Sequence, residues 1–162
     1  MQYFAPIKTK LNMKNTKASQ ALHNFENGMN CAQSVVSVFA ENLGLDLGTA
    51  LRLTSALGGG VGRKQEICGA FSGAAIVIGL MHGNQTPSDK ESKEMANTLT
   101  RQFLDKMEHE YGGLTCWHVL GTSLETNADR DKVKELNLTA TKCNPCILSV
   151  VELLEQMEKN KK

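Results

Sequence analysis

The sequence of 162 residues has few aromatic side chains and no strong excess of either charge. Aromatic residues make up 5% of the chain, so its core must be built mainly from aliphatic residues and methionine, as is common in helical proteins. The formal charge of +1 gives no net attraction to nucleic acid or to an anionic membrane. We therefore expect no nucleic-acid partner.

The sequence also lacks a long uninterrupted apolar segment. Residues 1–14 have no apolar run of the roughly 7–15 residues that a signal peptide needs, and we expect them to form a flexible N-terminal extension. The longest apolar stretch, residues 67–81, is shorter than the roughly 18–20 residues that span a bilayer and contains several glycines. We expect a buried core helix there, no membrane insertion and a cytoplasmic location.

No segment shows the alternating pattern of a β-strand. Helical spacing of apolar residues, interrupted by glycines and turn residues, instead predicts a series of helices. The predicted helices cover about 15–27, 30–43, 47–57, 64–82, 89–111, 114–120 and a last helix that follows Pro145. Residues 122–134 are polar and predict a loop with one helical turn or more. We predict an all-α fold, a single compact bundle of about six to eight helices formed by residues 15–158.

The helix predicted at 64–82 is the most apolar and has a nearly bare face. Small residues four apart allow another backbone to approach closely, although each glycine costs about 1 kcal/mol of helix propensity relative to alanine. The face consists of Gly69, Ala70, Gly73, Ala74 and Gly79. It predicts tight helix packing and makes a homodimer a reasonable expectation.

The chain has five cysteines: Cys31, Cys68, Cys116, Cys143 and Cys146. An odd number, in a protein expected to be cytoplasmic, argues against a set of stable disulfides. Free cysteine often packs as a small apolar residue, which is the simplest interpretation. However, each of the five lies near a predicted helix N-terminus, where the helix dipole and free N–H groups stabilise an anion. A thiolate is the form that attacks disulfides and binds metals.

Cys143 and Cys146 form a CxxC segment at the predicted start of the last helix. This spacing suits reversible dithiol chemistry and metal binding, because two sulfur atoms can form a bond or share an ion. The βαβ pattern of a thioredoxin fold is absent, so we exclude that fold. A zinc site of four cysteines usually has a second CxxC or CxxH pair, which the sequence lacks.

Residues 58–64, Gly-Gly-Gly-Val-Gly-Arg-Lys, form a glycine-rich segment that does not match a Walker phosphate-binding loop. We interpret it as a connection between two helices, packed close to the cysteines. Arg63 and Lys64 would then lower the pKa of Cys68 or offset the charge of a bound anionic cluster. The four histidines show no HExxH pair, and His118 is the one that could serve the cysteines as a base or ligand.

Three segments together resemble the C_GCAxxG_C_C family of redox-active proteins. They are the run Asn30-Cys31-Ala32-Gln33-Ser34-Val35, the loop at 58–63, and Cys68-Gly69-Ala70-Phe71-Ser72-Gly73, which is similar to the CGAxxG motif of the family. The resemblance covers about residues 15–158. The combination is specific, whereas the CGAxxG motif alone is weak.

The resemblance matches Cys31, Cys68 and Cys116 to the first three family cysteines. Cys146 fits the fourth position better than Cys143, which is then an additional thiol. The resemblance implies redox activity and, from related domains, an iron–sulfur site, for which four thiolates are the usual ligands.

Our leading hypothesis is therefore that Cys31, Cys68, Cys116 and Cys146 converge on a [2Fe–2S] or [4Fe–4S] cluster used for electron transfer with an unidentified redox partner protein. A second hypothesis is metal-free thiol–disulfide exchange, with Cys143 and Cys146 as the attacking and resolving thiols in either order. A third is a structural zinc ion held by four cysteines.

Overall fold

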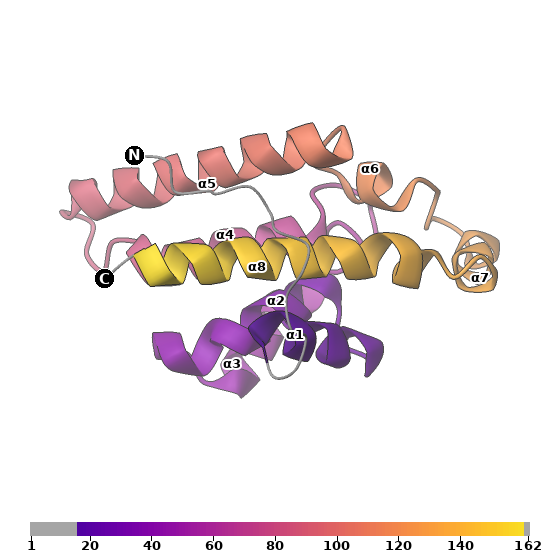
Figure 1. Cartoon of the computed structure of the whole chain (residues 1–162), viewed down its shortest axis with the longest axis horizontal. Helices are drawn as coiled ribbons and strands as arrows, with labels where there is room; N and C mark the ends of the chain where they lie inside the picture. Colours follow the sequence, from indigo (N-terminus) through magenta and orange to yellow (C-terminus); the bar gives the residue numbers. More distant parts are fainter. Residues whose placement is uncertain (1–15, 161–162) are drawn as a thin grey trace.

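The computed structural model describes residues 16–160 and shows an all-helical protein (Figure 1). The described residues form eight α-helices and no strand, which confirms the predicted fold class. The predicted N-terminal extension, residues 1–14, lies outside the described residues. The helices are α1 (Lys17–Glu26), α2 (Cys31–Ala40), α3 (Leu47–Thr54), α4 (Gly69–His82), α5 (Lys90–Tyr111), α6 (Cys116–Leu120), α7 (Asn127–Glu135) and α8 (Asn144–Asn160). Two short 3₁₀ turns, η1 (Glu41–Leu43) and η2 (Ser55–Leu57), and a π-helical turn, η3 (Thr139–Cys143), lie between them.

Helices α4 and α8 form the centre of the molecule (Figure 1). α5 packs on α4 from one side, and α1, α2 and α3 form a group on the other side, where α2 packs on α4 and α1 packs on α8. The short helices α6 and α7 lie together at one end of the bundle (Figure 1). This end is where the cysteines are found.

The core is largely aliphatic, as the composition predicts. Phe39, Phe71 and Phe103 are fully buried, and the rings of Phe71 and Phe103 meet edge to face with centroids 6.1 Å apart. The other large, fully buried side chains are Ile78, Leu99, Met107, Ile147, Leu153, Leu154 and Met157. Burial of each such side chain contributes about 1.5–3 kcal/mol, and together these contacts hold α2, α4, α5 and α8 in fixed positions.

Two glycines of α4 allow it to approach α2 closely. A Cβ atom placed on Gly73 would lie 3.1 Å from the Cα of Ala32. One placed on Gly69 would lie 3.1 Å from the Cβ of Cys31. A larger side chain at either position would have to push the helices apart, because protein interiors are close-packed. The predicted tight packing is confirmed, and it brings the start of α4 next to Cys31.

This packing also removes the basis of the predicted homodimer. Gly69, Ala70, Gly73 and Ala74 are buried within the chain, and only Gly79 of the small-residue face is exposed. The face that was expected to meet a second copy is thus occupied by the chain's own helices. The homodimer itself stays an untested prediction.

Asn30 fixes the start of α2. Its side chain accepts a hydrogen bond from the backbone N–H of Gln33 at 2.9 Å, and the Gln33 side chain accepts one from the backbone N–H of Asn30 at 3.0 Å. This reciprocal pair is a capping box, which satisfies two N–H groups at the helix start. The Asn30 amide also donates to the carbonyl oxygens of Thr54 and Ser55 at 3.1 and 3.0 Å. Cys31, the first residue of α2, is therefore held beside the end of η2.

Three predicted boundaries differ from the structure. The central helix begins at Gly69 and not near 64, because the residues before it pair with a second segment of the chain. The polar stretch 122–134 contains most of the nine-residue α7. The last helix does not begin after Pro145, since α8 starts at Asn144 and follows η3 without a break.

Among residues 16–160, no helix has both the length and the apolar character needed to cross a bilayer.

Candidate functional site

The five cysteines come from four separate parts of the chain. Cys31 is the first residue of α2, Cys116 is the first residue of α6, and Cys68 immediately precedes α4. Cys143 is the last residue of η3, and Cys146 lies in the first turn of α8. Because η3 runs directly into α8, the last two cysteines lie inside a continuous helical segment. Both therefore lie near the start of α8, as predicted, although α8 continues directly from η3.

All five cysteines border one small cavity. Ala70, Val119 and Ile147 complete its lining, and its volume is about 10 Å³. None of the five forms a disulfide. The structure thus brings together the residues that the sequence predicted to converge, including Cys143, which the family resemblance leaves as an additional thiol.

A short antiparallel bridge holds Cys68 beside Cys116. Ile67 pairs with Thr115, the N–H of Cys68 donates to the carbonyl of Leu114 at 2.9 Å, and the N–H of Cys116 donates to the carbonyl of Glu66 at 2.7 Å. This pairing explains why α4 starts later than predicted. It also fixes two thiols that are 48 residues apart in the sequence.

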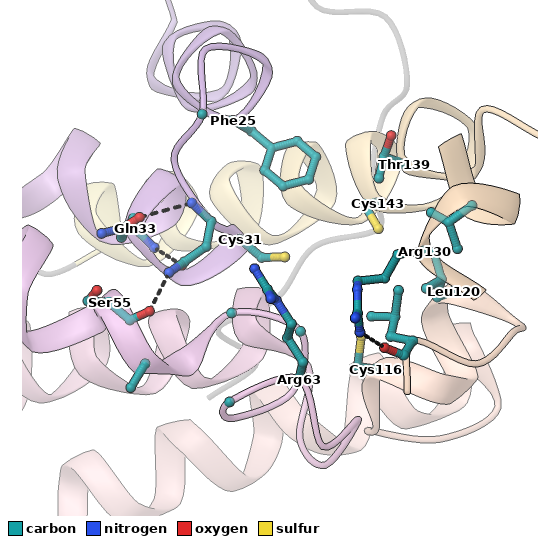
Figure 2. A pocket seen from close by; sticks show the side chains of 18 residues that line it. Phe25, Cys31, Gln33, Ser55, Arg63, Cys116, Leu120, Arg130, Thr139 and Cys143 are labelled. Atoms are coloured by element: carbon teal, nitrogen blue, oxygen red, sulfur yellow. Dashed lines mark hydrogen bonds between the residues drawn. The ribbon is translucent and has the colours of Figure 1, made fainter. Parts of the chain in front are cut away.

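The cluster has an inner and an outer part. Cys68 and Cys146, the inner pair, line the small cavity and are 4% and 1% exposed. Cys31, Cys116 and Cys143, the outer three, line both this cavity and a larger one of about 720 Å³ (Figure 2). The outer three therefore separate the inner cavity from an opening that a small molecule can enter.

Burial dominates the ionisation of the outer thiols. Burial, followed by the neighbouring Cys68, raises the pKa of Cys31 to about 12. Burial and the other cysteines likewise raise the pKa of Cys116 to about 12, and they raise the pKa of Cys143 as well. The predicted lowering of these pKa values by helix N-termini is therefore wrong, because desolvation of the thiolate outweighs the helix dipole.

A hydrogen bond joins the two thiols of the inner pair. The Cys146 thiol donates a hydrogen bond to Cys68, which lowers the pKa of Cys68 and raises that of Cys146. The backbone N–H groups of Ala70 and Phe71 also lower the pKa of Cys68. Cys68 is thus the thiol most easily ionised, as its position at a helix start predicts. The cause is this hydrogen bond and not the proximity of Arg63 and Lys64.

The cluster fits a metal cofactor in donor type and number. Thiolates are soft ligands that bind zinc and iron–sulfur clusters, and five thiols exceed the four that either group usually needs. In the described part of the chain, however, no three cysteine, histidine, aspartate or glutamate side chains are arranged to hold one metal ion. The inner cavity has about the volume of one water-sized sphere. The present spacing therefore suits no single ion, and a larger group would need the space beyond the outer three.

The glycine-rich segment lies against the cluster, as predicted. The backbone N–H of Gly59 donates a hydrogen bond to the sulfur of Cys31, and Gly58, Gly59, Gly62 and Arg63 line the larger cavity. His118, in contrast, is exposed, hydrogen-bonds to the Thr115 hydroxyl at 2.7 Å and lines neither cavity that the cysteines border. The predicted role of His118 as a base or ligand has no support in this geometry.

Arg130 is a site residue that the sequence did not reveal. It lies on α7 and lines the larger cavity, but the segment Asp129-Arg130-Asp131-Lys132 resembles an ordinary solvated stretch. The sequence did contain a signal for the start of a helix before Arg130. Thr126 and Asp129 have the spacing of a capping box and form one at the start of α7, which would have placed Arg130 on a helix.

Comparison with known proteins supports the grouping of the cysteines. No curated protein and no solved structure matches the chain. Residues 29–157 match the family model described as "Putative redox-active protein (C_GCAxxG_C_C)", a range that includes all five cysteines and both glycine motifs. Most of the chain is covered, and the chain therefore belongs to the C_GCAxxG_C_C family of redox-active proteins.

Proposed function

We propose that this protein transfers electrons through an iron–sulfur cluster held by Cys31, Cys68, Cys116 and Cys146, with Cys143 as an additional thiol. The observation that supports this proposal is that all five thiols border one cavity. A cysteine that only fills space in a core needs no other cysteine beside it. The convergence of every cysteine on one point therefore indicates a shared chemical role.

The surroundings of the thiols suit a group bound by thiolates. Four thiolates carry negative charge that apolar surroundings alone would not stabilise. The Gly59 N–H donates to Cys31, and two backbone N–H groups at the start of α4 donate to Cys68. Arg63 and Arg130 add positive charge in the adjoining cavity. Hydrogen bonds to the sulfur ligands and local charge are among the features that set the reduction potential of such a site.

An iron–sulfur cluster, when bound, supplies reversible one-electron transfer. The chain's own residues determine where the electron can leave. Cys68 and Cys146 face the apolar core, whereas Cys31 and Cys116 border the larger cavity. The route to a redox partner therefore runs through the outer side of the site.

Metal-free thiol–disulfide exchange is less well supported. It requires a thiol that is both accessible and ionised. Cys143 borders the larger cavity, but burial raises its pKa, so that its thiol stays protonated at neutral pH. Cys68 has a lowered pKa but is 4% exposed and lies in the inner pair. The thiol that a substrate could reach and the thiol that ionises most easily thus belong to different cysteines.

The test is metal analysis of the full-length protein purified without oxygen. The metal-free protein is also incubated with ferrous iron and sulfide under reducing conditions. We expect bound iron and acid-labile sulfide in equal amounts, visible absorption that bleaches on reduction, and an electron paramagnetic resonance signal in one oxidation state.

Other results would contradict the proposal in distinguishable ways. Zinc in an amount equal to the protein, without sulfide, would indicate a structural site. A metal-free protein that reduces a test disulfide, and that loses this activity on Cys143→Ser, would indicate dithiol chemistry. A protein that binds no metal and reacts with no disulfide would reduce the cysteines to core packing.

A further inference from the structure

The larger cavity beside the thiols has the size of a small-molecule site. Its volume of about 720 Å³ lies within the range of about 300–1,000 Å³ typical of ligand pockets. Residues from α1, α2, the 58–63 loop, α6, α7 and η3 form its walls. Figure 2 shows Cys31, Cys116 and Cys143 around this space with the side chains of Arg63 and Arg130 extending into it. Even eight iron and sulfide atoms, at roughly 30 Å³ each, would leave most of the cavity free.

The lining of this cavity is positively charged. It includes two arginines and no aspartate or glutamate. Arg63 forms no ion pair with any residue between 16 and 160, where the ion pairs are Lys17–Glu158 and Lys134–Asp131. The pocket therefore presents two guanidinium groups whose charges no lining carboxylate balances.

Arg130 is held in a defined position. Its guanidinium donates to the carbonyl oxygens of Leu124 and Glu125 at 2.7 and 3.0 Å, and also to the side chain of Asn127. A guanidinium has five N–H donors, so these bonds leave two for a ligand. A side chain fixed in this way loses little conformational entropy when it binds an anion.

The loop that bears Arg63 is also fixed. The side chain of Gln65 donates to the carbonyl of Thr122 at 2.7 Å and accepts from the N–H of Leu124 at 2.8 Å. Gln65 thereby joins the Arg63 loop to the segment that positions Arg130. Val61, Arg63 and Gln65 all have positive φ values of 56–66°, a conformation that is strained for residues other than glycine and persists only where the surrounding structure holds it.

The remaining walls determine what kind of anion fits. Phe25, Leu120, Leu124 and Val133 add apolar surface to the lining of the cavity. A bare inorganic ion would leave this surface without a partner. An organic molecule with an anionic group at each end would contact both arginines and the apolar walls.

We infer that this cavity binds a small organic dianion, carrying carboxylate or phosphate groups, between Arg63 and Arg130 and against the outer three thiols. This site goes beyond electron transfer, because the two arginines and the apolar walls of the cavity would contact a ligand other than the cluster. The alternative is that the two arginines serve only to offset the charge of an iron–sulfur cluster. In that case the metal-free protein would have no affinity for dianions, and this difference makes the inference testable by itself.

The experiment is calorimetric titration of the metal-free, reduced, full-length protein. The probes are glutarate, with two carboxylates, propane-1,3-diol bisphosphate, with two phosphates joined by a three-carbon chain, and glutaramide, the uncharged analogue of glutarate. We expect saturable binding of at least one dianion and none of glutaramide. The probe that binds more tightly identifies carboxylate or phosphate as the preferred group.

The variants are Arg63→Gln and Lys64→Gln. Both remove one positive charge from the same exposed loop, but only Arg63 lines the cavity. Because hydrogen bonds to charged groups are among the strongest, we expect Arg63→Gln to weaken dianion binding about tenfold or more. Lys64→Gln should leave it nearly unchanged. The side chain of Arg63 forms no hydrogen bond or ion pair with residues 16–160, and the backbone hydrogen bond from its N–H to the carbonyl of Gly58 does not depend on the side chain, so its replacement should not disturb folding.

A second readout uses the thiols. A dianion seated in the cavity should slow alkylation of Cys31 and Cys143 by uncharged iodoacetamide, and Arg63→Gln should remove this protection. Equal weakening by Arg63→Gln and Lys64→Gln would show only attraction to overall charge and would overturn the inference. So would the absence of binding by both dianions, whether or not the protein holds a cluster.

Discussion

Cys68 and Cys146 are buried among the residues of α4 and α8, whereas Cys31, Cys116 and Cys143 border a cavity formed largely by loops and short helices. The inner pair is positioned by the core, and a hydrogen bond joins its two thiols. The outer three are positioned by the capping of α2, the bridge to α6 and the end of η3. The group of five cysteines thus combines a rigid inner side with an outer side that borders the larger cavity, and each side can be perturbed separately.

The largest expected effect separates two cysteines that lie three residues apart. Cys146→Ser should abolish assembly of an iron–sulfur cluster, because it removes a proposed ligand and the partner of Cys68 in the inner pair. Cys143→Ser should keep most of the bound iron, since the proposed ligand set does not include it. The iron and sulfide content of each variant after reconstitution measures these two effects.

Circular dichroism of the metal-free variants provides the control, because both serines should leave the helical content unchanged. If Cys143→Ser lost its iron while Cys146→Ser retained it, the assignment of ligand and additional thiol would be reversed. The distinction between inner and outer thiols would then no longer predict function.

The second prediction concerns the pH dependence of the outer thiols in the metal-free protein. Thiolate is the reactive form, and its fraction rises about tenfold per pH unit below the pKa. With pKa values raised to about 12, Cys31 and Cys116 should be alkylated about a hundredfold faster at pH 9 than at pH 7. A free thiol with a pKa of about 8.5 gains only roughly 25-fold over this range.

Mass spectrometry of individual cysteine peptides after treatment with iodoacetamide measures these rates. A glutathione sample treated in parallel supplies the unburied reference. Cys146 should stay unmodified until the protein unfolds, since it is 1% exposed. If the alkylation rate of Cys31 rose with pH by the same factor as that of glutathione, the Cys31 thiol would not be desolvated.

The third prediction addresses the helix packing that joins the two sides. Gly73→Val should lower the free energy of unfolding by about 1–3 kcal/mol, because the new side chain would overlap the backbone of Ala32. Gly79→Val is the matched control on the same helix, since no atom lies within 4 Å of its Cβ position. Its stability should be unchanged or slightly higher, because valine has the better helix propensity. Urea denaturation followed by circular dichroism measures both, and equal losses would show that the contact between α2 and α4 is not tight.

The sequence predicted the fold class and the convergence of the cysteines because both depend on patterns along the chain. Apolar periodicity places the helices, and the small residues at 69 and 73 predict the close contact that brings Cys31 next to the start of α4. The N-terminus of a helix was located correctly where a local signal exists, as at Asn30.

The ionisation of the thiols could not be predicted in the same way. The helix dipole can be inferred from the sequence, but the desolvation that outweighs it depends on the tertiary packing of the cluster. The π-helical turn that places Cys143 inside a continuous helical segment has no sequence signal that we recognise. The cationic cavity was missed because Arg63 and Arg130 are 67 residues apart and meet only through the loops joined by Gln65.

The smallest expected effect is at the edge of the outer side, where Asp129 caps the helix that bears Arg130. The Thr126 backbone N–H, the Thr126 hydroxyl and the Ser123 hydroxyl lower the pKa of Asp129 by hydrogen-bonding to its carboxylate. Because the folded-state pKa is the lower one, the cap stabilises α7 fully above the unfolded value of about 3.9 and loses this effect as the pH falls through the folded value. Amide NMR signals of α7 should therefore shift at acidic pH while those of α4, beside the inner pair, do not. Asp129→Asn should remove the dependence, and a simultaneous shift of both helices would mean that the two sides of the cluster unfold as one unit.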